Sequence, residues 1–222
     1  RINAIAVPGI EHVTAVSGGG KHSVAVTVDG SVFMWGKGDE GDNHIPRPIS
    51  WGEGAKAITQ VACGDKHTML VSREGNAFAF GNNSSGQLGL GDTTNRKTPV
   101  QVIEMRSKVV QVAAGGAFGE AHTVALTNLG ELFAWGSGRR GQIGIAEAIS
   151  TTGNFTTPRQ VVSLRGKSVI SVSCGWHCTA CIVDEAPFAP QSIIESSETL
   201  GLFSILSEDV IKSILELLDG KS

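Results

Sequence analysis

Charge and cysteine are both scarce in this chain. The formal net charge is −3 and the isoelectric point about 6.1, so the sequence lacks the basic excess that favours nucleic acid or an anionic membrane surface as a partner. Four cysteines among 222 residues are too few for a disulfide framework, which favours a cytoplasmic or nuclear setting over secretion. No apolar run approaches the roughly 18 residues of a membrane span, so none is predicted.

Glycine, in contrast, is abundant, with 29 of the 222 residues, and its positions recur in a pattern. A glycine precedes a histidine, a second glycine follows eight residues after the histidine, and an aromatic–glycine pair ends 14 residues after it. The three copies are Gly19, His22, Gly30, Trp35-Gly36; then Gly64, His67, Gly75, Phe80-Gly81; then Gly119, His122, Gly130, Trp135-Gly136. This spacing indicates a repeat protein, and a repeat explains glycine and histidine patterns that would otherwise suggest active sites.

Each repeat is predicted to form four short antiparallel strands. In the second copy, alternating residues 67–72, a turn at Glu74-Gly75 and the strand 76–80 predict a hairpin. Four strands per repeat are typical of a propeller blade. The sequence therefore predicts an all-β, partial β-propeller of about three and a half blades, followed by a C-terminal α-helix. The predicted ranges are blades at about 10–50, 57–103 and 108–162, a half blade at about 168–183, a linker at 186–206 and an amphipathic helix at 207–219.

Two glycine-rich segments carry a family resemblance. Segment 135–144 has the Trp-Gly-x-Gly-x-x-Gly-Gln-Ile/Leu-Gly pattern, and segment 81–91 shares its Gly-Gln-Leu-Gly part. With these segments as its clearest carriers, the chain resembles the regulator of chromosome condensation repeat over residues 10 to 185. The resemblance implies a seven-bladed propeller. It also implies functions as diverse as nucleotide exchange on the small GTPase Ran, nucleosome binding, ultraviolet-B perception and protein interaction within ubiquitin ligases.

The blade count departs from that family. Three and a half blades cannot close a seven-bladed ring, and unpaired strand edges are normally covered. Because the sequence begins at Arg1 rather than methionine, we expect the remaining blades on the same longer polypeptide. An open, capped array and a ring completed by a second chain remain alternatives.

The pattern also fails inside the repeats. From Val112 to His122 there are ten residues where Val61 to His67 has six, which adds four residues within 115–119. Blade one lacks the Gln-Leu-Gly segment, and the half blade places Cys178 at the histidine position. A lengthened loop on one propeller face is a usual place for a binding contact.

The tail 207–219 carries a wide apolar stripe and an N-cap at Ser207. We expect this helix to cap the exposed blade edge or to begin a following domain. Its opening, Leu206-Ser207-Glu208-Asp209, faintly resembles the first helix of an F-box, which is the alternative.

Several motifs suggest chemistry but are explained by blade construction. The dinucleotide-like segments 36–41 and 136–141 lack the helix that a phosphate site needs, so we interpret them as repeat turns. The cluster Cys174, His177, Cys178 and Cys181 is interpreted as buried cysteine rather than zinc ligands, because positions 178 and 181 point to opposite faces of a strand. We expect no cofactor and no metal.

The repeated residues are expected to be structural. We assign the three histidines a shared hydrogen-bonding role and the aromatic residues inter-blade packing. The structural set is His22, His67, His122, Trp35, Phe80, Trp135, Gly36, Gly81 and Gly136.

The sequence thus favours a non-enzymatic scaffold that presents propeller loops to a partner protein. The candidate contacts are Lys66, Phe118, Glu120, Arg139, Arg140 and Trp176, with Asp39, Glu40 and Asp42 as a second patch. One alternative is a guanine-nucleotide exchange factor or regulator of a Ran-like small GTPase. The other is a substrate-receptor part of an F-box or BTB ubiquitin ligase.

Overall fold

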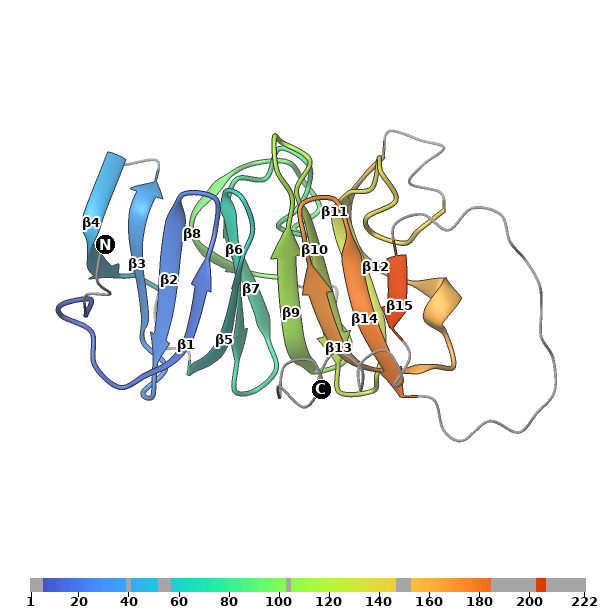
Figure 1. The fold of residues 1–222 in the computed structure, drawn as a ribbon, viewed down its shortest axis with the longest axis horizontal. Coiled ribbons are helices and arrows are strands. Elements are labelled where there is room, and N and C mark those ends of the chain that lie inside the picture. Colours follow the sequence, from blue (N-terminus) through green and yellow to red (C-terminus); the bar gives the residue numbers. More distant parts are fainter. Residues whose placement is uncertain are drawn as a thin grey trace, which may run out of the picture.

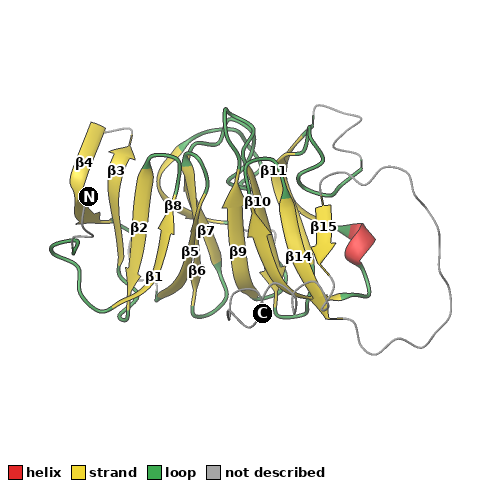
Figure 2. Cartoon of the chain, viewed as in Figure 1, coloured by secondary structure: helices red, strands yellow, loops and turns green. Residues whose placement is uncertain are grey.

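The computed structural model describes residues 6–38, 41–51, 57–102, 105–146, 153–184 and 203–206. Within these ranges the chain consists of strands and one short 3₁₀ helix, η1 (Val162–Leu164). The strands form four sheets, which stand side by side in a row (Figures 1 and 2). No helix in these ranges is long and apolar enough to cross a membrane. The predicted all-β fold of antiparallel blades is confirmed.

Three of the sheets contain four antiparallel strands in sequence order, and we call them blades one, two and three. Blade one contains β1 (Val13–Gly18), β2 (His22–Thr27), β3 (Val32–Gly38) and β4 (Gly41–Pro48). Blade two contains β5 (Ile58–Cys63), β6 (His67–Ser72), β7 (Ala77–Gly81) and β8 (Arg96–Gln101). Blade three contains β9 (Val109–Gly115), β10 (His122–Thr127), β11 (Leu132–Ser137) and β12 (Asn154–Gln160).

The fourth sheet, which we call the half blade, differs from the prediction. It contains β13 (Ser168–Cys174) and β14 (Thr179–Asp184), which are antiparallel, and also β15 (Phe203–Leu206), which runs parallel to β14. Residues 203–206 were predicted to be linker. They pair because the edge of β14 offers unpaired backbone groups, and a long connection lets a distant segment approach it in parallel. The predicted helix at 207–219 lies outside the described residues.

Repeated glycines allow the second and third strands of each blade to pair. Gly36, Gly81 and Gly136 have φ values of 101°, 103° and 89°, a region that favours glycine. Each is paired with the histidine of its own blade, and a Cβ on any of them would lie 2.9 Å from the Cα of that histidine. The histidine and the aromatic–glycine pair of the signature therefore oppose each other in one ladder.

The hydrophobic core lies between the sheets. Val24 of blade one packs in one cluster with Leu70 of blade two, and Met69 of blade two packs in another with Trp135 of blade three. A third cluster joins blade three to the half blade. Each sheet thus buries apolar surface only against its neighbours, which is typical of a repeat array.

Candidate protein-binding site

The repeated histidines connect neighbouring sheets. Their Nε2 atoms lie at hydrogen-bond distance from threonine Oγ1 atoms of the next sheet: His22 and Thr68 at 2.9 Å, His67 and Thr123 at 3.0 Å, His122 and Thr179 at 3.1 Å. Thr123 Oγ1 donates its single proton to the carbonyl oxygen of Gln87, 2.8 Å away, and Thr179 Oγ1 does the same to that of Gln142, at 2.7 Å. The imidazole Nε2–H of His67 and of His122 must therefore be the donor.

Burial keeps these imidazoles neutral. Desolvation lowers the pKa of His67 to about 3 and that of His122 to about 4, and it also lowers the pKa of His22. Near neutral pH the neutral rings of His67 and His122 therefore act as donors between sheets, and the neutral ring of His22 lies at hydrogen-bond distance from Thr68. The three histidines thus link each sheet to the next through the same side-chain contact.

In the third repeat, the glycine equivalent to Gly64 of the second repeat is Gly115 rather than Gly119. Gly64 lies against the imidazole of His67, and a Cβ on Gly115 would lie 2.6 Å from Cε1 of His122. Gly115 is also paired with His122 in the ladder. A Cβ on Gly119, in contrast, would meet no atom within 4 Å. The Gly119-x-x-His122 spacing reproduces the signature by coincidence, because the four added residues follow Gly115.

The glutamine in the glycine-rich loop has a role that the sequence analysis missed. The carbonyl oxygen of Gln87 accepts from Nε1 of Trp135 at 2.9 Å as well as from Thr123. The Gln87 side chain holds its loop by accepting from the Ser85 amide and donating to Asn82 Oδ1. The recurrence of Gly-Gln-Leu/Ile-Gly was the available signal.

The half blade has no histidine at the repeat position, and its cysteines are not arranged as a metal site. Gly175 N donates to Cys178 O, as Gly64 N does to His67 O, so Cys178 stands at the histidine position. Burial raises the pKa of Cys174 to about 12 and also raises that of Cys181. Among the residues that the structure describes, no group of three or more His, Cys, Asp or Glu side chains could hold a metal ion.

The inserted loop, residues 116–121 between β9 and β10, is braced on both sides. Its carbonyl at Gly119 accepts from Ser85 Oγ of blade two at 2.6 Å. Its amide at Gly116 donates to Gly175 O of the half blade at 3.2 Å. Phe118 at the loop tip has a φ of 53°, which is uncommon for a bulky residue. In this conformation the left-handed backbone at Phe118 places an aromatic ring at the loop tip.

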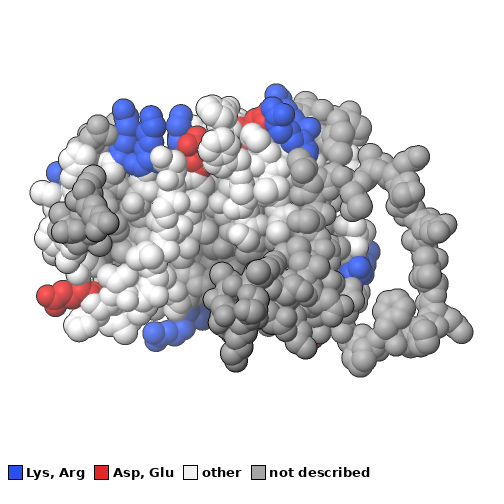
Figure 3. Space-filling view, viewed as in Figure 1, with Lys and Arg blue, Asp and Glu red and all other residues white. Residues whose placement is uncertain are grey.

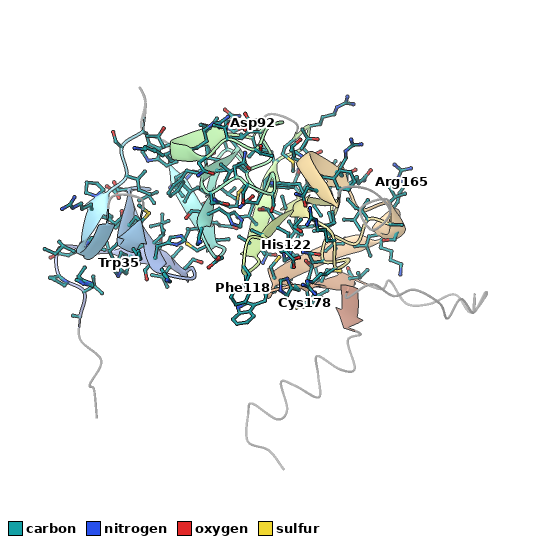
Figure 4. The ribbon with its side chains drawn as sticks, turned by 90° about the horizontal axis from the view of Figure 1, so that it is seen from above. Trp35, Asp92, Phe118, His122, Arg165 and Cys178 are labelled. Carbon is teal, nitrogen blue, oxygen red and sulfur yellow. The ribbon has the colours of Figure 1, made fainter. Side chains whose placement is uncertain are left out.

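Phe118 meets Trp176 at the outer surface. Their ring centroids are 6.0 Å apart with an interplanar angle of 89°, an edge-to-face geometry that aromatic pairs favour. Phe118 is nevertheless 87% exposed and Trp176 68% exposed. Figure 4 shows Phe118 at the margin of the array, close to Cys178, with Trp35 at the far end. We call the side chains of Phe118 and Trp176 the aromatic pair.

Charged groups surround the aromatic pair. Glu120 Oε2 accepts from Arg140 Nε at 2.5 Å and lies 3.6 Å from His177 Nδ1. The hydrogen bond from Arg140 lowers the pKa of the Glu120 carboxyl, and the positive charges of Arg140 and Arg139 add to this. Lysine and arginine side chains are visible along the upper edge in Figure 3, the end where the β9–β10 loop stands in Figure 1.

The structure brings most of the predicted contacts together. Phe118, Glu120 and Arg140 lie in or beside the inserted loop, with Trp176 in contact from the half blade. A cavity of about 250 Å³ next to the loop is lined by Ser84, Ser85, Gly119, Glu120, Ser137, Arg139 and Asn154. Arg139 thus belongs to the same region.

The other predicted contacts are placed elsewhere. Lys66 is exposed in the turn between β5 and β6. Asp39 and Glu40 lie outside the described residues, and Asp42 lies in β4. Whether any of these residues contacts a partner stays a prediction.

Sheets of four antiparallel strands, packed face to face and joined by the same side-chain contacts at successive interfaces, define the chain as a β-propeller repeat protein. The family model for the regulator of chromosome condensation (RCC1) repeat matches residues 29–71, 74–126 and 130–182. The chain belongs to this family.

Known proteins of several kinds are similar to it. The human E3 ubiquitin-protein ligase HERC2 is 35% identical over 170 residues, which is 72% of this chain and 3% of HERC2. The ultraviolet-B receptor UVR8 of Arabidopsis thaliana is 35% identical over 179 residues, which is 77% of this chain and 39% of UVR8.

Among solved structures, human WBSCR16 superposes with a TM-score of 0.65 at 23% identity, over 77% of this chain and 46% of that one. This likeness concerns the fold alone. The chain spans less than half the length of each of these three proteins.

Proposed function

We propose that this chain is a non-enzymatic protein-interaction module whose contact surface is the aromatic pair with the charged groups around Glu120. The observation that carries the proposal is that Phe118 and Trp176, from two different sheets, are held in contact while both remain largely exposed. Exposed aromatic residues flanked by arginine are the composition of interaction hot spots.

The backbone at Phe118 supports the same proposal. A positive φ at a bulky residue costs of order 1–2 kcal/mol. The hydrogen bonds from Ser85 and to Gly175 hold the loop in this shape, and the ring gains little burial from it. Strain of this kind concentrates at sites that bind ligands or partners.

The proposal is tested by capturing the partner at the loop and then measuring affinity. Phe118 is replaced by a photo-crosslinking phenylalanine analogue to identify the bound protein in the native cell. We then expect Trp176→Ala to weaken its binding at least about tenfold, because central aromatic hot spots contribute about 2 kcal/mol or more.

Leu129→Ala is the matched control. Leu129 is also apolar and 67% exposed, but it lies in the turn between β10 and β11, at the other end of the sheets. Its replacement should leave the affinity unchanged. Equal effects of the Trp176 and Leu129 variants, or none from either, would rule out the aromatic pair as the contact surface.

Similarity to HERC2 favours a narrower version, in which the module recruits substrates to a ubiquitin ligase. The identity of 35% extends over 170 residues of this chain. In that case the captured partner should be ubiquitinated in cells, and Trp176→Ala in the full protein should reduce its ubiquitination.

Regulation of a small GTPase is the other candidate, and it rests on family membership. A nucleotide-release assay on a Ran-like GTPase separates it from the scaffold proposal. Acceleration by this chain would establish exchange activity, whereas a scaffold leaves the release rate unchanged.

A further inference from the structure

A second cavity lies at the end of the sheets opposite the aromatic pair. It has a volume of about 440 Å³ and stands between the β10–β11 turn of blade three and the connection 161–168 that leads to the half blade. Val169 N donates to Gly130 O at 3.2 Å and so joins these two segments. Figure 4 shows Arg165, one of the lining residues, at the margin away from Trp35 and apart from Phe118. The cavity is therefore separate from the proposed contact surface.

The connection carries two cationic side chains into the cavity wall. The amides of Arg165 and Lys167 each donate to the carbonyl oxygen three residues earlier, at 3.0 Å. Gly166 between them has a φ of 82°, and a Cβ on it would meet no atom within 4 Å. A tight turn of the backbone thus places both cations at the same cavity.

Both cations are accessible to a ligand, since Arg165 and Lys167 are exposed. The guanidinium of Arg165 donates through Nη2 to Gln160 Oε1 at 3.3 Å, and Gln160 Nε2 donates to Glu131 Oε1 at 3.0 Å. These bonds orient the guanidinium and leave its other N–H groups available. The Lys167 ammonium makes no hydrogen bond or ion pair within the part of the chain that the structure describes.

The charges of the wall favour an anion. Two cations, Arg165 and Lys167, stand against the single carboxylate of Glu131, so a negative ligand is attracted and a positive one repelled. A guanidinium matches the two oxygens of a carboxylate with parallel N–H groups. Leu129 lines the same cavity and is 67% exposed, so it can cover a short apolar group beside the carboxylate.

We propose that this cavity binds a carboxylate whose neighbouring carbon bears a short apolar side chain, as at the end of a protein chain that finishes in leucine, isoleucine or valine. The carboxylate accepts from the guanidinium of Arg165 and the ammonium of Lys167, and the apolar side chain packs on Leu129. The inference goes beyond the proposed function and does not depend on it, because it uses other residues at the other end of the sheets.

Three leucine derivatives that share one side chain and differ in charge test the proposal. The ¹⁵N-labelled chain is titrated near neutral pH with N-acetyl-L-leucine, N-acetyl-L-leucinamide and L-leucinamide, which are anionic, neutral and cationic. We expect saturable shifts of the Gly130, Gly166 and Lys167 amides with the anion only. Equal shifts with the neutral or cationic compound, or none with the anion, would overturn the proposal.

Variants of opposite sign assign the charges. Arg165→Ala should weaken binding of N-acetyl-L-leucine at least about tenfold, because hydrogen bonds between charged groups are the strong ones. Glu131→Gln should tighten it about twofold, since it removes a negative charge from the wall. Arg73→Ala, an exposed arginine in the β6–β7 turn of blade two, is the matched control and should have no effect. Equal affinities of the two arginine variants, or weaker binding by Glu131→Gln, would contradict the assignment.

A protein C-terminus and a free branched-chain acid share this chemistry, and two further ligands distinguish them. The peptide N-acetyl-Ala-Ala-Leu places the same carboxylate at the end of a chain, whereas 4-methylpentanoate has no peptide group. Binding of the peptide as tight as that of N-acetyl-L-leucine supports the protein source. Binding of 4-methylpentanoate together with none of the peptide would overturn it.

Leu129→Ala separates this proposal from the previous one. It should weaken binding of N-acetyl-L-leucine about threefold through lost apolar contact and leave the partner captured at Phe118 unaffected, whereas Trp176→Ala should do the reverse. If Trp176→Ala does not weaken the captured partner but Arg165→Ala weakens N-acetyl-L-leucine, the aromatic contact falls and the cavity stands. The opposite pair of results removes the cavity and leaves the aromatic contact.

Discussion

At the residue scale, Gly115 allows β9 of the third repeat to pack closely against His122 and against Cys174 of the half blade. A Cβ there would lie 2.6 Å from the His122 imidazole and 2.9 Å from Cβ of Cys174. We expect Gly115→Ala to lower the free energy of unfolding by about 1–3 kcal/mol through overpacking. Gly18→Ala, where a Cβ meets nothing within 4 Å, should change it by less than about 0.5 kcal/mol. Urea denaturation measures both, and equal losses would contradict the alignment on Gly115.

The same residues show what the sequence could predict. A shared hydrogen-bonding role for the histidines was predictable, because all three stand at one position of the repeat. Their partners were not, since Thr68 and Thr123 belong to the following repeat and a contact between sheets leaves no spacing rule within one repeat. Phe118 and Trp176 were predicted as separate contacts. They touch because the inserted loop is hydrogen-bonded to the half blade at Gly175, a contact between sheets that the sequence does not predict.

At the element scale, the glycine-rich loop of one blade and the third strand of the next act as a pair. Blade three has Trp135, whose indole N–H donates to Gln87 O of blade two. Blade two has Phe80 at the same position, and blade one, which precedes it, lacks the Gln-Leu-Gly segment. A residue without a side-chain donor thus follows the blade that lacks the Gln-Leu-Gly segment.

Exchanging the two aromatic residues tests this pairing. Trp135→Phe should destabilise the chain by at least about 1 kcal/mol, through the lost hydrogen bond and the smaller buried area. Phe80→Trp should also destabilise, because Phe80 is 5% exposed and a larger indole would overpack its site. Thermal unfolding followed by circular dichroism measures both, and a stabilising Phe80→Trp would contradict the pairing.

The strand β15 shows the limit of prediction at this scale. The three complete blades have local hairpins marked by turn glycines, so their strands could be read from the sequence. Residues 203–206 join β14 in parallel from a distant part of the chain, and no local turn signal predicts such a pairing. The linker prediction failed there for that reason.

At the scale of the whole molecule, the buried histidines make stability depend on pH. His67 and His122 have folded pKa values of about 3 and about 4, below the unfolded value of about 6.5. Their stabilisation is complete above pH 6.5 and is lost as the pH falls, because the unfolded chain then binds protons that the folded chain excludes. Each contributes a slope of about 1.4 kcal/mol per pH unit between about pH 6 and pH 4.

Urea denaturation at successive pH values measures this slope. We expect His122→Gln to be less stable at pH 7 but to have a shallower slope between pH 6 and pH 5. Glu120→Gln should leave that part of the slope unchanged, since the pKa of Glu120 is lowered from its usual value and it titrates at lower pH. Parallel pH profiles for the wild type and His122→Gln would contradict the role of the buried imidazole.

The bonds between sheets also give the array a polarity. His67 and His122 donate toward the C-terminal neighbour, and Thr123, Thr179 and Trp135 donate toward glutamine carbonyls of the N-terminal neighbour. The two faces of a blade therefore carry different and complementary hydrogen-bonding groups. Contacts of this kind join units head to tail, because each face of a blade complements the opposite face of the next blade. Blades can be added to such a stack in one orientation only, and the hydrogen-bonding groups on both faces of each blade determine the order in which the blades follow one another.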